Sequence, residues 1–179
     1  MIADGHECVE AYTLSREEII AHMPTTHGIM IRSRITIDKD FLDRSPVLKF
    51  IARAGAGMES IDMEYATKKG VACLNSPEGN RNAVGEHAMG MLLSLFNNLN
   101  RADRHFRAGE SSRKKNRGHD LEGKTVGIIG YGNMGSAFAE KLKGFNCKIF
   151  AYDKYKTNFG NEYIAESSLE EIKNNADVV

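Results

Sequence analysis

Short apolar runs alternate with amphipathic segments from the start of the chain. The first run, Glu7 to Tyr12, predicts a strand, and Ser15 and Glu18 have the spacing of a capping box that opens a helix toward His22. The run GIMIRSR, which begins at Gly28, predicts the next strand. Such an alternation is typical of a parallel sheet covered by helices, so the pattern predicts an α/β fold.

The alternation continues through the first half of the chain and completes a small α/β unit. A glycine at position 70 is placed to end the last helix of this unit. The further elements expected are a helical turn at 38–43, a strand at 48–53, a helix at 61–69 and a strand at 71–75. We therefore predict a first domain at residues 1–76.

One long helix is predicted from Asn82 to Arg107. Its apolar residues lie on more than one face of that helix, which is typical of a helix buried between domains or subunits. These residues are Val84, Ala88, Met91, Leu92, Leu95, Phe96 and Leu99. We expect helix 82–107 to connect two domains and to support a homodimer, and an ordinary core helix is the alternative interpretation.

A second α/β unit follows, and we predict a second domain at residues 77–179. The expected elements are a strand at 125–130, a helix at 134–143 ended by Gly144, strands at 148–153 and 162–164, a helix opened by the capping box Ser168 to Glu171, and the start of a strand at Asp177 to Val179. A complete dinucleotide-binding sheet has about six strands. We therefore expect this domain to be truncated at its end, and the first domain to lack an opening strand and helix.

The sequence Gly130-Tyr-Gly132-Asn133-Met134-Gly135 matches a dinucleotide-binding pattern that is weak alone and strong between a strand and a helix. The first glycine permits a tight turn, the second lets the backbone approach a pyrophosphate, and the third lets helix and strand pack closely. The amides at the start of the helix then face the phosphates. A glycine turn without a ligand is the alternative.

Asp153 ends the next predicted strand, where an acid can accept hydrogen bonds from the adenine ribose. Its negative charge would repel a 2′-phosphate, so the expected cofactor is NAD rather than NADP. The neighbouring basic residues Lys154 and Lys156 instead favour the 2′-phosphate of NADP.

A candidate carboxylate site lies at the strand ends of the first domain. Arg53 precedes the loop residues Ala54, Gly55, Ala56 and Gly57, whose amides with a neighbouring guanidinium could hold a carboxylate. A tight turn with a surface arginine is the alternative. Arg32 and Arg34 end the preceding strand at the same edge of the sheet, and a solvated surface explains them equally well.

The composition argues against nucleic acid, membrane surfaces and metal ions as partners. The 24 basic and 24 acidic residues cancel, so no overall charge attracts nucleic acid or a membrane surface. Cys8, Cys73 and Cys147 are too widely spaced for a zinc site or a disulfide framework, which favours a reduced, cytoplasmic protein without a metal. No apolar run indicates export or membrane insertion.

Six stretches, taken in order, resemble the D-isomer-specific 2-hydroxyacid dehydrogenases, and among these most the members that act on D-3-phosphoglycerate. They are RSR (32–34), KFIARAGAGMESID (49–62), LNSPEGN (74–80), GEHAMGMLL (85–93), LEGKTVGIIGYGNMG (121–135) and AYD (151–153). The resemblance implies an incomplete flavodoxin-like substrate domain, followed by the front half of a Rossmann NAD-binding domain across a cleft. It also implies a homodimer.

The resemblance further implies an NAD-dependent enzyme for a small hydroxy or keto acid. Arg53 to Gly57 and Asn75 would lie near the substrate carboxylate, and Arg32 and Arg34 near a substrate phosphate. The family's catalytic arginine, glutamate and histidine lie beyond Val179, so no catalytic residue is assigned and these 179 residues are expected to be inactive. A non-catalytic, dinucleotide-sensing binding protein of the same fold is the rival interpretation.

Overall fold

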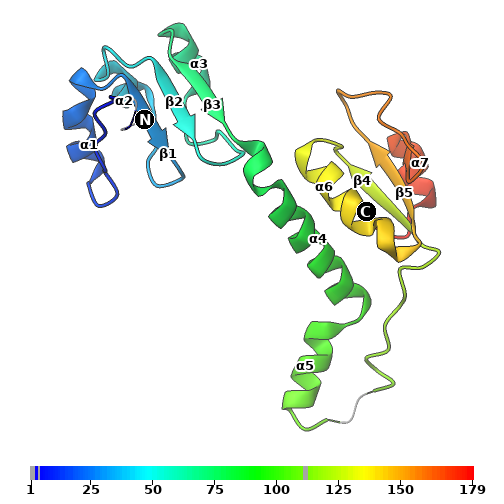
Figure 1. Cartoon of the computed structure of the whole chain (residues 1–179). Helices are drawn as coiled ribbons and strands as arrows, with labels where there is room; N and C mark the ends of the chain where they lie inside the picture. The colour runs from blue at the N-terminus through cyan, green and yellow to red at the C-terminus, as the bar shows by residue number, and fades with distance from the viewer. Residues whose placement is uncertain (1–2, 4, 111–112) are drawn as a thin grey trace. The chain divides into compact units, whose positions relative to one another are not determined.

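The computed structural model describes residues 3, 5–110 and 113–179, which divide into two units at 1–79 and 80–179. Each unit is of the α/β type and contains a three-stranded parallel sheet (Figure 1). A short 3₁₀ turn at Pro77–Asn80 leads from the first unit into the second. The prediction of an α/β fold is confirmed.

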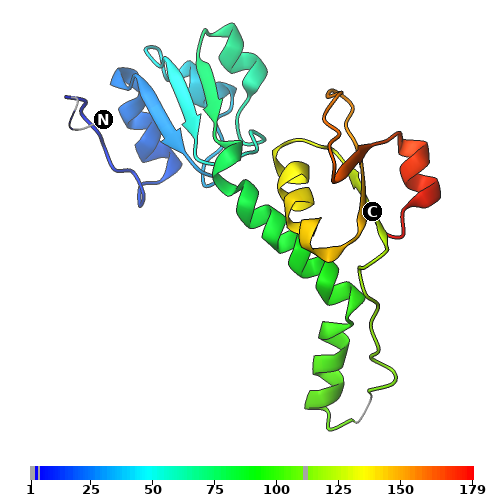
Figure 2. The same ribbon diagram turned by 45° about the vertical axis from the view of Figure 1, so that its right-hand side comes forward.

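The sheet of unit 1 has the order β1-β2-β3, with the strands side by side in Figure 2. Its elements are α1 (Arg16–His22), a 3₁₀ turn (Met23–Thr25), β1 (Gly28–Ile31), α2 (Lys39–Asp43), β2 (Phe50–Arg53), α3 (Met63–Lys68) and β3 (Ala72–Asn75). Ile37, Phe41, Leu42 and Ile51 are fully buried at its centre. Gly70 ends α3 with φ +73°, a conformation that favours glycine, as its position predicted.

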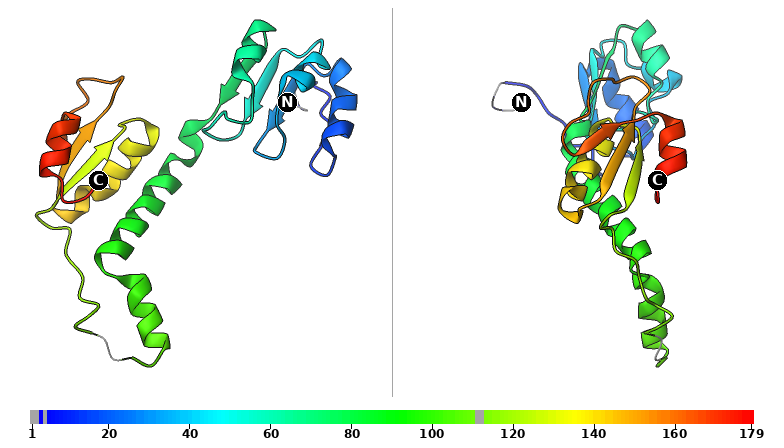
Figure 3. Two further views of the ribbon diagram at one scale, coloured as in Figure 1. Left: turned by 180° about the vertical axis from the view of Figure 1, so that it is seen from behind. Right: turned by 90° about the vertical axis from the view of Figure 1, so that its right-hand side faces the viewer.

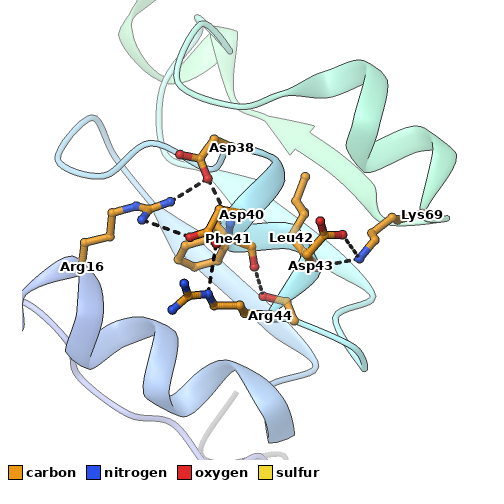
Figure 4. Close-up of polar contacts among 9 residues, drawn as sticks. Arg16, Asp38, Asp40, Phe41, Leu42, Asp43, Arg44 and Lys69 are labelled. Atoms are coloured by element: carbon orange, nitrogen blue, oxygen red, sulfur yellow. Dashed lines mark hydrogen bonds and ion pairs between the residues drawn. The ribbon is translucent and has the colours of Figure 1, made fainter.

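Ion pairs join the helices of unit 1 around α2 (Figure 4). The Arg16 guanidinium of α1 lies 2.6 Å from the carboxylate of Asp38, the residue that caps α2. At the other end of α2 the Asp43 carboxylate lies 2.7 Å from the Lys69 ammonium and accepts a hydrogen bond of 2.7 Å from the Tyr65 hydroxyl. These contacts fix α2 against α1 and α3.

The strand predicted at Glu7 to Tyr12 is wrong, because this segment is irregular and joins no sheet. Its side chains at Val9 and Tyr12 are 60% and 79% exposed, so they bury no face against a neighbour as a strand would. The carbonyls of Ala11 and Leu14 instead accept hydrogen bonds from the Arg34 guanidinium, at 2.6 and 2.7 Å.

Unit 2 has the strand order β4-β5-β6, and Val178 forms a parallel bridge to Val126 on the free side of β4. The helix α6 covers one face of this sheet and α7 the other (Figures 2 and 3). The elements are α4 (Arg81–Phe96), α5 (Leu99–Arg107), β4 (Thr125–Ile129), α6 (Asn133–Leu142), a 3₁₀ turn (Lys143–Phe145), β5 (Lys148–Tyr152), β6 (Ile164–Glu166) and α7 (Leu169–Asn175). A strand order in which later segments return beside the first strand is that of a Rossmann half.

The single helix predicted at 82–107 is wrong, since α4 and α5 are separate. Asn98 has the left-handed φ of 53°, which asparagine tolerates better than most residues. The Phe96 carbonyl at the end of α4 finds its partner further along the chain, where the His119 amide donates a hydrogen bond of 2.9 Å to it. The Asn98 side chain donates to the Arg117 carbonyl at 3.0 Å.

The end predicted for the helix of the glycine motif also needs correction. After α6 the chain makes a 3₁₀ turn, and Asn146, with φ 52°, adopts the left-handed conformation expected of Gly144. Both predicted capping boxes are confirmed, at Ser15 with Glu18 and at Ser168 with Glu171.

Candidate functional site

The glycine motif forms the turn between β4 and α6. Gly130 has φ +99° and donates its amide to the Tyr152 carbonyl at 2.7 Å, which ties the turn to the neighbouring strand. A Cβ atom at Gly135 would lie 1.9 Å from the Gly130 carbonyl oxygen. Because no side chain fits in that space, glycine at this position is what allows α6 to start directly against β4.

The first amides of α6 are unpaired. Gly132 caps the helix without a side-chain hydrogen bond, and among the described residues no acceptor binds the amides of Gly132, Asn133, Met134 or Gly135. The start of a helix also carries about half a positive charge. Such a set of amides binds a phosphate or pyrophosphate without a lysine.

The carboxylate of Asp153 is held beside this turn. One of its oxygens accepts a hydrogen bond of 2.7 Å from the Tyr131 amide, and the other accepts bonds of 2.8 and 3.0 Å from the amides of Tyr155 and Lys156. The Tyr155 amide lowers the pKa of Asp153 most, and the Tyr131 and Lys156 amides lower it further. The group is therefore an anion at neutral pH.

An aromatic pair at this site was not predicted from the sequence. The rings of Tyr131 and Phe159 stack with centroids 4.5 Å apart and planes 21° from parallel. Tyr131 is the residue between the first two glycines of the motif, while Phe159 lies in the connection from β5 to β6. The one available signal was an aromatic residue inside the motif, and nothing in the spacing identifies its partner.

The helix α4 supports α6 from outside the sheet. A Cβ atom at Gly85 would lie 2.9 Å from the Ala137 carbonyl group, so the two helix backbones approach closely. Two polar contacts flank this crossing, with 2.5 Å between the Lys141 ammonium and the Asn82 side-chain oxygen and 3.4 Å between the Arg81 guanidinium and the Glu140 carboxylate. The packing fixes the helix that starts at the unpaired amides.

In unit 1 the strand register places two predicted residues, Arg53 and Asn75, side by side. Ile31 pairs with Arg53, and Arg53 with Asn75, so the carboxyl ends of β1, β2 and β3 share one edge. The Arg53 guanidinium donates to the carbonyls of Gly57 and, at 3.3 Å, of Arg32. The Asn75 side chain donates to the Ala56 carbonyl at 2.6 Å.

The hydrogen bonds from Arg53 and Asn75 to the carbonyls of Gly57 and Ala56 fix the loop Ala54 to Gly57. Two amides of this loop remain unpaired. The amides of Ala54 and Gly55 bond to the carbonyls of Ile31 and Arg53, whereas within the described ranges those of Ala56 and Gly57 reach no acceptor. The Arg53 side chain is 14% exposed and lies 3.7 Å from the Glu59 carboxylate. Two adjacent free amides beside a guanidinium can accommodate a carboxylate.

Among the described residues, the side chains of the remaining candidates, Arg32 and Arg34, form no hydrogen bond with this loop. The Arg34 guanidinium bonds to the N-terminal segment, as described above, and Arg32 is exposed. All six histidines are described, and none lies at the carboxyl end of a strand: they are His6, His22, His27, His87, His105 and His119. In the described part of the chain no three His, Cys, Asp or Glu side chains group as metal ligands, and no described helix has the length and apolarity to cross a bilayer.

Comparison with known proteins gave consistent matches. The family model for "D-isomer specific 2-hydroxyacid dehydrogenase, catalytic domain" matches residues 2–177. The D-3-phosphoglycerate dehydrogenase of Archaeoglobus fulgidus is 37% identical over 155 residues, which cover 87% of this chain and 29% of that enzyme. The chain thus spans less than a third of that relative's length.

Two solved structures are also similar. The NAD-dependent formate dehydrogenase of Staphylococcus aureus, in complex with NAD, aligns with a TM-score of 0.81 at 27% identity, over 99% of this chain and 54% of that one. The D-lactate dehydrogenase of Aquifex aeolicus, complexed with NAD and lactic acid, aligns with a TM-score of 0.79 at 26% identity, over 89% and 49%.

Proposed function

The chain belongs to the D-isomer specific 2-hydroxyacid dehydrogenase family, and we propose that it forms part of an NAD-dependent enzyme that oxidises a D-2-hydroxy acid or reduces the keto acid. The observation that carries the proposal is the juxtaposition of the unpaired amides at Gly132 to Gly135 with the Asp153 carboxylate. In this proposal residues 77–179 are the NAD-binding domain and residues 1–76 the substrate domain.

The residues of unit 2 would bind the pyrophosphate and adenosine of NAD. The amides of Gly132 to Gly135 would hold the pyrophosphate, and Asp153 would accept a hydrogen bond from the adenine ribose. Because Asp153 is an anion, it would disfavour the 2′-phosphate of NADP. The bound nicotinamide would supply the hydride acceptor or donor for the reaction.

The residues of unit 1 would orient the substrate. The free amides of Ala56 and Gly57 would bind its carboxylate, and Arg53 and Asn75 would keep the loop in the required shape. We propose D-3-phosphoglycerate as the substrate, because a relative that is 37% identical to this chain is a D-3-phosphoglycerate dehydrogenase. Arg32, exposed at the same strand edge, would contact the substrate phosphate.

The 179 residues are expected to bind NAD without turning it over. A hydroxyl proton must be accepted by a base near the substrate carbon, and no histidine of this chain lies at the strand ends that carry Ala56 or Gly132. We also propose a homodimer through α4 and α5, because Met91, Leu95 and Phe106 are 58%, 69% and 83% exposed. The three free cysteines support a reducing, cytoplasmic setting.

Calorimetric titration tests the proposal. The purified chain should bind NAD more tightly than NADP, and Asp153→Asn should reduce the difference. No heat and no thermal shift at millimolar NAD would refute the cofactor site. A titration with D-3-phosphoglycerate distinguishes the enzyme from the rival dinucleotide sensor. In a substrate-binding loop the NMR signals of the Ala56 and Gly57 amides should shift, whereas in a sensor they should stay unchanged.

A further inference from the structure

The turn after β4 and the connection after β5 are joined at one residue, Tyr131. Its amide donates to an Asp153 oxygen at 2.7 Å, and its ring stacks on Phe159 at 4.5 Å between centroids. Both segments lie at the carboxyl end of the sheet (Figure 1). A single residue of the glycine motif therefore holds the β5–β6 connection at two points, one near its start and one near its middle.

The connection has few other anchors. Residues 154–158 are exposed, and Tyr155 is 86% exposed. Phe159 packs against the core of unit 2, and its amide donates to the Glu166 carboxylate at 3.1 Å. Because the stretch between Asp153 and Phe159 buries little surface of its own, the stacked ring is its principal apolar anchor.

The state of Asp153 makes this anchoring relevant to ligand binding. An ionised carboxylate offers about four acceptor positions, and the amides of Tyr131, Tyr155 and Lys156 occupy three of them. One position is then left for a ribose hydroxyl. The direction of that position depends on how the connection is held.

We propose that the Tyr131–Phe159 stack is a positioning device that fixes the Asp153 carboxylate relative to the amides of α6 before a dinucleotide binds. The inference rests on the proposed NAD site and deepens it. Phe159 acts through Asp153 and touches no ligand itself. If the stack is lost, the connection must be ordered during binding, and that ordering lowers the affinity.

The first test needs no ligand. In Phe159→Leu the amide hydrogens of Tyr131, Tyr155 and Lys156 should exchange about three- to tenfold faster than in the wild type, the range that the energy of an aromatic pair implies. The matched control is Tyr163→Leu, because Tyr163 lies in the same connection and contacts Lys143 instead. Unchanged exchange in Phe159→Leu would overturn the inference.

The second test uses ADP-ribose, which carries the adenosine and pyrophosphate without the nicotinamide. By calorimetry Phe159→Leu should weaken its binding about three- to tenfold, while Phe159→Tyr should restore it. In an Asp153→Asn background, Phe159→Leu should have no further effect. An equal loss in both backgrounds would show that Phe159 does not act through Asp153 and would overturn the inference.

The two proposals fail differently in these experiments. If wild-type chain does not bind ADP-ribose, the proposed cofactor site is wrong and this inference falls with it. If the wild type binds and Phe159→Leu binds equally well, the cofactor site stands and only the positioning role is overturned.

Discussion

Alanine at two glycines of the same motif should affect different properties, stability at Gly135 and ligand binding at Gly132. At Gly135 a Cβ atom would lie 1.9 Å from the Gly130 carbonyl oxygen and 3.2 Å from a methyl group of Ile128. At Gly132 a Cβ atom would meet nothing within 4 Å, and its φ of −84° suits alanine. We expect Gly135→Ala to destabilise unit 2, and Gly132→Ala to spare the fold while obstructing the approach of a pyrophosphate.

The magnitude at Gly135 follows from two opposing terms. Overpacking a well-packed site costs typically about 1–3 kcal/mol. Because the added Cβ atom would lie far closer to backbone than a van der Waals contact, we expect a cost at the upper end, about 3 kcal/mol. Alanine improves helix propensity by about 1 kcal/mol over glycine. The expected net loss in the free energy of unfolding is therefore about 2 kcal/mol.

Hydrogen exchange with mass spectrometry measures this loss separately in each unit. Peptides from 125–142 should lose protection in Gly135→Ala, while peptides from 28–75 of unit 1 serve as an internal reference. In Gly132→Ala both sets should match the wild type, although NAD binding is weakened. A loss below about 0.5 kcal/mol in Gly135→Ala would show that the site accommodates a Cβ atom, since exposed substitutions alone produce changes of that size.

Three further predictions concern other residues. Asp153→Ala should lower the affinity for NAD more than that for NADP in calorimetry, and equal losses would contradict its role at the ribose. Asn98→Ala and Asn98→Gly both lose the hydrogen bond to the Arg117 carbonyl, but only alanine is strained at φ 53°, so Asn98→Ala should have a free energy of unfolding about 1 kcal/mol below that of Asn98→Gly in a denaturant titration. Lys69 first and the Tyr65 hydroxyl second lower the pKa of Asp43 in the folded chain, so its stabilising contribution is present at neutral pH and is lost as the pH falls through that lowered pKa. The melting temperature of Asp43→Asn should therefore depend less on pH below about 4 than that of the wild type, and parallel curves would exclude this role.

The sequence could predict what depends on neighbours along the chain. The capping boxes at Ser15 and Ser168 and the left-handed turn at Gly70 need only local spacing, and the structure contains all three. The placement of Asp153 beside the glycine turn follows from strand order in a parallel sheet. The roles of these residues toward a ligand stay a prediction.

Features that depend on distant partners could not be predicted. The break at Asn98 is stabilised by the segment around Arg117 and His119, which returns along the end of α4. Likewise, the contacts of Arg34 with the N-terminal segment and the stack of Phe159 on Tyr131 join residues that no periodicity relates. Each was visible in the sequence only as a residue type suited to the contact.

In the proposed function, the unpaired amides at the start of α6 bind the pyrophosphate of NAD. NMR spectra of the ¹⁵N-labelled chain recorded during an NAD titration test it most directly. Binding of the pyrophosphate should produce large, saturable shifts at the amides of Gly132, Asn133, Met134 and Gly135, and a smaller set around Asp153. Saturating NAD that leaves these four signals in place, or that shifts only residues of unit 1, would contradict it.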